Sequence, residues 1–330
     1  MKIKIFKAED ISQSLSMSEA VEVVKRAFVQ LSSKQAQSPV RTSLNLKNPG
    51  EVALTMPAYL SETFALGTKI VTFLPQNPEK GRPAVQALVV LFDAKTGGPS
   101  AVFEGTHLTR LRTGAATGAA TQVFSRGDSK KLALFGAGGQ AFFQVMGVRA
   151  VRKVEKIMIY DVLPEKAEAL INLLRLNPLD QDAEIAQARS PEEALAGADI
   201  VVTATSSSQP VFPGKNLGQG THINAIGAFK PEMQEVDEET ILRSQIFVDS
   251  VEACLEEAGD LIIPLNKGLI RKSDIQAELG EVIAGRKPGR RSDQEITYFK
   301  SVGNAVQDVA VAQAIWQRAA EKGLGQEVEL

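Results

Sequence analysis

Residues 132–145, LALFGAGGQAFFQV, decide the fold that this sequence predicts. An apolar strand runs into the spacing Gly136-x-Gly138-x-x-Ala141, and a helix is predicted to follow over residues 140–149. The first glycine permits a tight turn, the second lets a pyrophosphate approach the backbone, and the third position needs only a small side chain. The N–H groups at the start of the helix can then bind phosphate. The stretch therefore predicts a dinucleotide-binding turn, with a tight turn that binds no ligand as the alternative.

A second strand, residues 156–161, ends in an acidic residue about twenty residues after the glycine turn. The carboxylate of Asp161 can accept hydrogen bonds from the ribose of an adenosine, and it would repel a 2′-phosphate. This residue favours NAD(H) as the cofactor, with NADP(H) as the alternative. A methyl donor that carries a similar ribose is a further interpretation of the same two features.

The sequence after residue 130 alternates between strand-like and helix-like segments, which is typical of a parallel sheet covered by helices. Earlier in the chain, an amphipathic helix over residues 16–33 is followed by short β-rich runs that favour antiparallel pairing. We therefore predict an α/β fold, in which a Rossmann-type doubly wound parallel sheet is joined to an α+β domain. The strands predicted for the parallel sheet are residues 131–136, 156–161, 200–205, 221–227 and 245–250.

A domain boundary is predicted near residue 120, within a helix rich in small residues over residues 106–125. Residues 121–303 then form the dinucleotide-binding domain. The last helix is long enough to leave that domain, so residues 304–330 are predicted to pack back on residues 1–120 and complete the α+β domain.

Polar and small residues lie at the ends of two further predicted strands. Ligands of doubly wound sheets bind at the carboxyl ends of the strands. Thr203 and Thr205 end one strand, and Asn224, Ala225 and Gly227 end the next. We interpret these residues as cofactor-binding, with ordinary loop packing as the alternative.

Cations lie in otherwise apolar or small-residue surroundings at Arg41, Lys69 and Arg112. Lys69 belongs to a strand-like run that looks half-buried, and a buried ammonium needs a partner. A substrate carboxylate would serve, because arginine offers it a bidentate fork. Taken singly, each residue is better interpreted as a surface charge, and the sequence alone does not bring the three together.

The composition excludes several classes of protein. Of 330 residues 44% are hydrophobic and the formal net charge is -2, so a sizeable core is expected, and neither nucleic acid nor a membrane surface is a predicted partner. The single cysteine, Cys254, excludes an internal disulfide and favours a reducing compartment. Because His107 and His222 are the only histidines, no metal site is predicted. With no apolar run long enough to span a bilayer, these features predict a soluble cytoplasmic protein.

Several motifs together resemble the ornithine cyclodeaminase/mu-crystallin family over almost the full chain. The family includes cyclodeaminases, alanine dehydrogenase, and reductases of cyclic and acyclic imino acids. The resemblance implies a homodimer, in which the N-terminal domain with the C-terminal helix carries the substrate and makes the dimer, while a Rossmann domain holds NAD(P). The matching stretches, in chain order, are PVRTSL, MPAY, GTKIVTF, LTRLRTGAAT, FGAGGQA, TATSS, HINAIGA and KSVGNAVQD.

The resemblance also assigns roles to residues. It makes Arg41, Lys69 and Arg112 the group that binds the substrate carboxylate. Arg112 would also lie near the nicotinamide, and Thr72 would approach the cofactor. The other positions that it places along the cofactor are Gly138, Gly139, Gln140, Asp161, Thr203, Asn224, Ala225, Ile226 and Gly227.

Two departures from the cyclodeaminase pattern narrow the activity. Cyclodeaminases carry a glutamate just before the MP pair, where this chain has Thr55, and an aspartate shortly after NAIG, where it has Ala228 and Phe229. Without these carboxylates the chain lacks the means to bind and cyclise a diamine. The form GAFKPEM is more similar to the imino-acid reductase branch, which acts on Δ1-pyrroline-2-carboxylate or a similar ketimine.

We therefore predict an NAD(P)H-dependent reductase that acts on a C=N bond beside a carboxylate. Lys69 is the predicted catalytic residue, since it could protonate the imine nitrogen, and an ordered water is the alternative proton source. Three other activities stay open, namely an amino-acid dehydrogenase such as alanine dehydrogenase, an ornithine cyclodeaminase, and a crystallin-like binding protein without activity.

Overall fold

The computed structural model describes residues 2–177 and 182–329. It contains two compact units, which are treated separately below. Unit 1 comprises Met1–Ala116 and Asn304–Leu330, and unit 2 comprises Thr117–Gly303. The division falls inside one helix, α3 (Gly105–Phe124). Across the described ranges, no helix combines the length and apolar character needed to cross a bilayer.

Unit 1 is built on a mixed sheet. Its strands are β1 (Lys2–Phe6), β2 (Ala36–Gln37), β3 (Thr42–Asn45), β4 (Val52–Leu60), β5 (Ala65–Phe73), β6 (Val85–Asp93), β7 (Pro99–Glu104) and β16 (Gln326–Glu329). Within the described residues their order is β16-β1-β7-β6-β5-β4-β2, and β3 also pairs with β4. Only β1 and β7 run parallel; the other neighbouring strands are antiparallel, as the β-rich runs predict.

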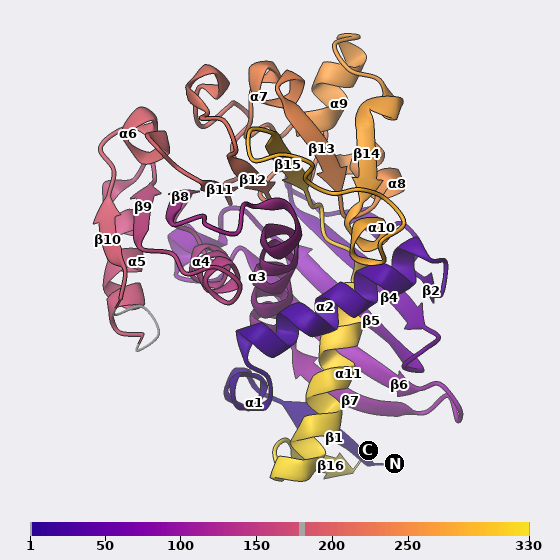
Figure 1. Ribbon diagram of the computed structural model, residues 1–330. Coiled ribbons are helices and arrows are strands. Elements are labelled where there is room, and N and C mark those ends of the chain that lie inside the picture. Colours follow the sequence, from indigo (N-terminus) through magenta and orange to yellow (C-terminus); the bar gives the residue numbers. More distant parts are fainter. Residues whose placement is uncertain (1, 178–181, 330) are drawn as a thin grey trace. The chain divides into compact units, whose positions relative to one another are not determined.

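Helices cover one face of the unit 1 sheet. Helix α11 (Ala305–Lys322) packs against β4, β5 and β6, and α2 (Met17–Ser32) packs against α11 in turn; Figure 1 shows α11 in yellow with α2 crossing it. The sequence predicts α2 well, because Ser16 and Glu19 form a capping box at its start. The remaining helical segments are α1 (Ala8–Ser14) and a 3-10 turn, η1 (Asn77–Lys80).

Unit 2 is built on a parallel sheet. Its strands are β8 (Lys131–Phe135), β9 (Lys156–Tyr160), β10 (Glu184–Gln187), β11 (Ile200–Thr203), β12 (His222–Ala225), β13 (Ser244–Val248), β14 (Ile275–Glu278) and β15 (Ile296–Lys300). In the part of the chain that the structure describes, the order is β10-β9-β8-β11-β12-β15-β13-β14. The chain leaves β8 toward β9 on one side and later returns to β11 on the other. This reversal is the switch point beside which doubly wound sheets bind ligands.

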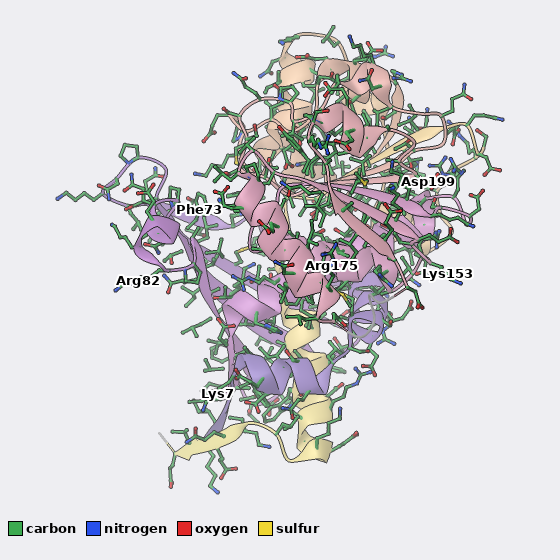
Figure 2. All side chains as sticks on the ribbon, turned by 90° about the vertical axis from the view of Figure 1, so that its left-hand side faces the viewer. Lys7, Phe73, Arg82, Lys153, Arg175 and Asp199 are labelled. Atoms are coloured by element: carbon green, nitrogen blue, oxygen red, sulfur yellow. The ribbon has the colours of Figure 1, made fainter. Side chains whose placement is uncertain are left out.

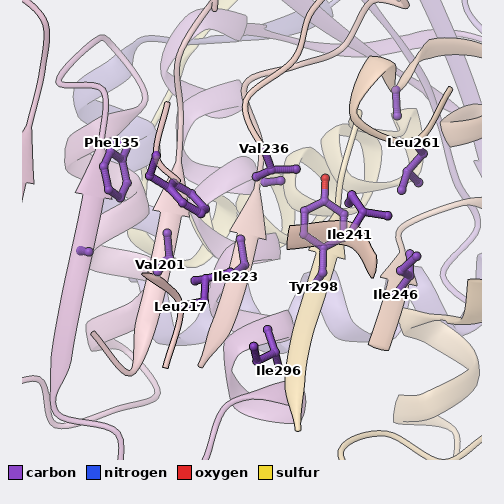
Figure 3. Packing of buried hydrophobic residues seen from close by; sticks show 14 of the residues in the cluster. Phe135, Val201, Leu217, Ile223, Val236, Ile241, Ile246, Leu261, Ile296 and Tyr298 are labelled. Carbon is purple, nitrogen blue, oxygen red and sulfur yellow. The ribbon is translucent and has the colours of Figure 1, made fainter. Parts of the chain in front are cut away.

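Both faces of this sheet are covered, and successive residues of a strand contribute to opposite faces. Leu132 and Leu134 belong to a cluster with α4 and α5, whereas Phe135 belongs to a second cluster on the other face. Figure 3 shows that second cluster, in which Phe135 and Tyr298 project from their strands to the same side. The unit 2 helices are α4 (Ala141–Arg149), α5 (Pro164–Arg175), α6 (Pro191–Leu195), α7 (Glu238–Leu242), α8 (Val251–Glu257), α9 (Gly259–Asn266), α10 (Leu279–Ile283), η3 (Gly214–Asn216) and η4 (Lys272–Asp274). The predicted fold class is thereby confirmed.

An aspartate fixes the amino-terminal edge of this sheet. Asp199, labelled in Figure 2, accepts hydrogen bonds from the backbone amides of Lys130 and Lys131 at 2.8 and 2.9 Å. Arg126 pairs with the same carboxylate at 2.6 Å. These bonds hold the entries of β8 and β11 together, at the edge opposite to the glycine turn.

Candidate active site

Two of the predicted cations of unit 1 are held by one acid. Lys69 on β5 places Nζ 2.9 Å from Oδ2 of Asp308, and Arg112 on α3 places Nε 3.1 Å from Oδ1 of the same carboxylate. Lys69 is 2% exposed, Arg112 is 6% exposed and Asp308 is fully buried. A buried charge persists only with a partner, and here one carboxylate serves two cations.

The strand pattern explains why Lys69 is buried. Residues of β5 alternate between the two faces of the sheet, and Lys69 lies on the face that α11 covers. Its cross-strand neighbours, Met56 and Val89, are apolar and buried. A Cβ on Gly67, on the same face, would lie 2.6 Å from the Val90 carbonyl oxygen of β6 and 3.3 Å from Val309 of α11, so glycine lets both elements approach β5.

This environment changes the acidity of Lys69. Burial lowers its pKa from the usual 10.5 to about 7, and the nearby charges of Arg112 and Arg41 act in the same direction. Asp308 opposes them through its charge and its hydrogen bond. The structure thus places Arg41 and Arg112 within electrostatic range of Lys69, which can gain or lose its proton near neutral pH.

Sequence reasoning missed two residues of this cluster, Asp308 and Gln307. Both are fully buried on α11, and Gln307 accepts a hydrogen bond from Nη1 of Arg112 through Oε1 at 2.5 Å. Its Nε2 is buried and has no hydrogen-bond partner among the described residues. A signal for Asp308 was available. This acid lies three residues after Ala305 and directly before Val309, so it interrupts the apolar stripe of an amphipathic helix.

Thr72 lies elsewhere. It lies three positions after Lys69 on β5, so the two side chains point to opposite faces of the sheet. Its hydroxyl donates to the Gln86 carbonyl oxygen at 3.5 Å. Unit 1 by itself therefore does not bring Thr72 into the cation cluster.

In unit 2 the glycine turn follows directly after β8. Gly136 has a φ of +94°, and a Cβ there would lie 2.8 Å from the Ala204 carbonyl oxygen, so only glycine fits. Gly138 and Gly139 are exposed, and a Cβ on Gly138 would meet no atom within 4 Å. The amide of Ala141 donates to the Gly138 carbonyl oxygen at 3.0 Å, which closes the turn where α4 begins.

Asp161 is tied to this turn. Its Oδ2 accepts a hydrogen bond from the Ala137 amide at 2.7 Å, and its Oδ1 accepts one from the Leu163 amide at 2.9 Å. The carboxylate therefore stands in a fixed position where β9 ends, beside the turn that follows β8. Each carboxylate oxygen can still accept a further hydrogen bond.

The loops that follow β11 and β12 are held by an acid that sequence reasoning did not assign, Glu235. It is fully buried and accepts from the hydroxyls of Thr203 and Thr205 at 2.9 and 2.8 Å. It also accepts from the amides of Thr205, Gly227 and Ala228 at 2.6, 2.7 and 3.1 Å. The side chains of Thr203 and Thr205 are thus used to hold the two loops together.

Glu235 belongs to a buried charge network. Asp260 accepts from the Glu235 amide at 2.6 Å and pairs with Lys300 at 2.9 Å. Burial raises the pKa of the Glu235 carboxyl, whereas Lys300 and the donors on Thr205 act to lower it. Burial acts to lower the pKa of Lys300, but the charges of Asp260 and Glu235 raise it overall. Each group thus depends on the others for its charge.

The remaining predicted residues lie on β12 and just after it. Asn224 is buried and donates through Nδ2 to the Thr121 hydroxyl at 3.0 Å. Ala225 and Ile226 are buried, and the Ile226 amide donates to the Thr203 carbonyl oxygen at 2.9 Å. The structure thus brings these positions next to Thr203 across neighbouring strands.

These residues fit a dinucleotide. The exposed glycine turn leaves open space beside Gly138, and the side-chain oxygen of Gln140 is buried without a partner among the residues described. The carboxylate of Asp161 lies at the next strand end. The backbone amides of a turn at a helix start bind pyrophosphate, and a carboxylate at the end of the next strand binds ribose hydroxyls.

Comparison with known proteins agrees with this geometry. The family model described as "Ornithine cyclodeaminase/mu-crystallin family" matches residues 1–323. The chain belongs to this family. The predicted family is thereby confirmed.

Members of the family are similar over their full lengths. A Δ1-pyrroline-2-carboxylate reductase of Bacillus cereus is 40% identical over 326 residues, covering 98% of this chain and 99% of that protein. Among solved structures, the Thermococcus litoralis Δ1-pyrroline-2-carboxylate reductase in complex with NADH and L-proline has a TM-score of 0.94 at 40% identity, covering 99% of this chain and 100% of that one. An archaeal alanine dehydrogenase dimer with bound NAD has a TM-score of 0.92 at 37% identity, with 100% of both chains covered.

Proposed function

We propose that this protein is an NAD(H)-dependent reductase of an imino acid, such as Δ1-pyrroline-2-carboxylate, which it would convert to L-proline. The observation that carries the proposal is the buried Lys69, with a pKa of about 7 between Arg41, Arg112 and Asp308. Such a group suits a substrate that needs both a cation for its carboxylate and a proton for its nitrogen. The similarity to reductases of this substrate supports the same activity.

Substrate binding rests on charge. Arg41, Lys69 and Arg112 outnumber the single buried acid, Asp308, so the cluster favours an added anion. A substrate carboxylate supplies that anion. Fixing it orients the adjacent C=N bond, which lowers the entropic part of the barrier.

Proton transfer is assigned to Lys69. Its ammonium donates a proton to the imine nitrogen, which makes the adjacent carbon more electrophilic, and the lysine regains its proton from solvent after the reaction. NADH, when bound, supplies the hydride that this carbon accepts. A pKa close to the working pH lets Lys69 be both protonated and able to release its proton.

Cofactor binding is assigned to unit 2. The turn at Gly136, Gly138, Gly139 and Gln140 is proposed to hold the pyrophosphate, and Asp161 the adenosine ribose. The carboxylate disfavours a 2′-phosphate, so the cofactor is NAD(H) rather than NADP(H). The relatives in complex with NADH and with NAD support this choice. The further residues proposed to line the cofactor are Thr72, Arg112, Thr203, Thr205, Asn224, Ala225, Ile226 and Gly227.

The protein is proposed to act in the cytoplasm. Cys254 is a free cysteine, and burial raises the pKa of its thiol. A chain that makes no use of disulfides is typical of a reducing compartment.

A homodimer is proposed through the uncovered face of the unit 1 sheet. Leu44, Ile70 and Leu88 lie on the face opposite to Lys69 and are 63%, 48% and 52% exposed. Clustered apolar side chains at a surface indicate an interface. The archaeal relative is a dimer.

Replacing both Ile70 and Leu88 with lysine is expected to convert the dimer to monomers. The two positions are cross-strand neighbours on the proposed interface, so the introduced lysines would face and repel the same lysines of the second subunit. Light scattering coupled to size-exclusion chromatography measures the mass. Lysine at the exposed positions Leu173 and Leu242 of unit 2 is the matched control and should leave the dimer intact. A wild-type protein that is monomeric at all concentrations would contradict the proposed assembly.

The pH dependence of the reaction follows from Lys69. Because the ammonium form is the proton donor, kcat/KM for imine reduction should fall as the pH rises through about 7. Amine oxidation needs the neutral amine, so its kcat/KM should rise over the same range. Initial rates in both directions, in buffers of constant ionic strength, test this. Two profiles that move in the same direction would argue against Lys69 as the proton donor.

The activity itself is tested with a panel of substrates. NADH and NADPH absorbance is followed with Δ1-pyrroline-2-carboxylate, Δ1-piperideine-2-carboxylate, and pyruvate with and without ammonia, and ammonia release from L-ornithine is followed with NAD. We expect rapid NADH oxidation with a cyclic imine and little with NADPH. Turnover of pyruvate that depends on ammonia would instead establish an amino-acid dehydrogenase, the second candidate that the archaeal relative favours. Ornithine deamination alone would establish a cyclodeaminase.

A further inference from the structure

We propose that Asp308 is a positioning residue of this reaction, which holds Lys69 and Arg112 as one unit and keeps Lys69 able to donate its proton. The inference rests on the proposed imine reduction. It concerns a residue of α11 that the substrate and cofactor assignments do not use.

The geometry places Asp308 between the two cations. Its Oδ2 lies 2.9 Å from Nζ of Lys69 and its Oδ1 lies 3.1 Å from Nε of Arg112, so each oxygen serves a different element of unit 1. The carboxylate is fully buried. A charge-assisted hydrogen bond on each oxygen fixes the distance between β5 and α3 at this point.

The second arm of Arg112 is also fixed by α11. Nη1 donates to Oε1 of the neighbouring residue Gln307. Nε and Nη1 are both used in this way, while no described residue accepts a hydrogen bond from Nη2. The helix thereby sets which edge of the guanidinium is left to bind a substrate carboxylate.

The charge balance around Lys69 depends on Asp308. The charged groups that act on Lys69 are Arg112 from α3, Arg41 from the segment before β3, and Asp308 from α11. The facing residues of β4 and β6, Met56 and Val89, are apolar. Asp308 is therefore the one acid among the described groups that favours the ammonium form, against two arginines and burial.

Replacing Asp308 with asparagine removes this charge and keeps the shape of the side chain. Lys69 should then lose its proton at lower pH. The falling limb of the pH profile, which is the pH range in which kcat/KM for imine reduction decreases, is therefore expected to move down by about one pH unit or more. The rate at about pH 7.5 should drop about tenfold, and most of it should return at about pH 5. Asp308→Glu keeps the charge, so the limb should stay in place while kcat falls.

A direct titration reads the same effect without turnover. With lysine labelled at Cε, the resonance that disappears in Lys69→Met belongs to Lys69, and its pKa is measured by NMR in the wild type and in both Asp308 variants. Glu321→Gln removes one exposed charge from the same helix and is the matched control. Thermal unfolding and NADH fluorescence check that each variant folds and binds cofactor.

A lower Lys69 pKa in Asp308→Asn, together with the shifted limb and recovery at low pH, is the expected result. An unchanged Lys69 pKa, or a rate loss that is equal at all pH values, would overturn the inference and leave Asp308 a purely structural residue. If Asp308→Asn does not fold, Asp308→Glu provides the test, because this variant keeps the charge. A fall of kcat/KM with pH that moves in Asp308→Glu by enough to explain its whole loss of rate would overturn the inference. A wild type without imine reductase activity would refute the proposed function, while the NMR titration would still report on Asp308.

Discussion

Replacing Lys69 with methionine is expected to lower kcat/KM for imine reduction by about 10³-fold, the range typical of a lost general acid. Methionine fills the space between β5 and α11 but can neither donate a proton nor attract a carboxylate. The loss should appear in kcat and in KM together, since both roles are removed. Stopped-flow or steady-state NADH absorbance with Δ1-pyrroline-2-carboxylate measures it.

The fold should survive this substitution. Asp308 keeps its bond to Arg112, so its buried charge stays paired when Lys69 is removed. Lys287→Met, in an exposed loop of unit 2, is the control and should leave the activity unchanged. A Lys69→Met variant that reduces the imine at close to the wild-type rate would remove Lys69 from the mechanism.

Replacing Glu235 with alanine is expected to lower the free energy of unfolding by about 3–5 kcal/mol, because it breaks a buried charge network and leaves its partners unpaired. The hydroxyls of Thr203 and Thr205 and the amides of Thr205, Gly227 and Ala228 would all lose their acceptor. Lys300 would keep Asp260 but lose its second nearby acid. Urea denaturation followed by circular dichroism measures the change.

A matched control comes from an exposed acid of the same unit. Glu238 pairs with Lys267 at 2.6 Å at the surface, so Glu238→Gln should lower the free energy of unfolding by less than about 1 kcal/mol. NADH affinity, measured by fluorescence, should also fall in Glu235→Ala, because the loops after β11 and β12 would no longer be held. A Glu235→Ala protein as stable as Glu238→Gln would show that these hydrogen bonds contribute little.

The dinucleotide turn could be predicted from the sequence because its determinants are local. Gly136 must be glycine for reasons set by its own backbone angle and by the adjacent loop, and the acid that follows the next strand lies at a fixed interval. The helix at residues 16–33 was predictable for the same reason, since its capping box lies within the segment itself.

The cation cluster could be predicted only in part. Each cation drew attention because of its apolar neighbours, but Lys69 and Asp308 are separated by 239 residues along the chain. No local pattern pairs them, so the acid was missed although it interrupts the apolar face of α11. Gln307 was missed because a glutamine in a helix carries no comparable signal.

The order of strands in unit 2 also could not be predicted from local sequence patterns. Strand β15 was not among the predicted strands, yet it lies between β12 and β13 in the sheet. Its last residue, Lys300, is fully buried because Asp260, 40 residues away, is its partner. Likewise, the hydroxyls of Thr203 and Thr205 point to Glu235, a bond that depends on how the following loop folds back.

The central claim is that this protein transfers a hydride from NADH to the carbon of an imino acid. The most direct measurement incubates the protein with Δ1-pyrroline-2-carboxylate and NADH that carries two deuterium atoms at C4 of the nicotinamide, and analyses the product by mass spectrometry. The account predicts proline with one deuterium at Cα and one NADH consumed per proline formed. Unconsumed NADH with no proline, or proline without deuterium, would contradict it.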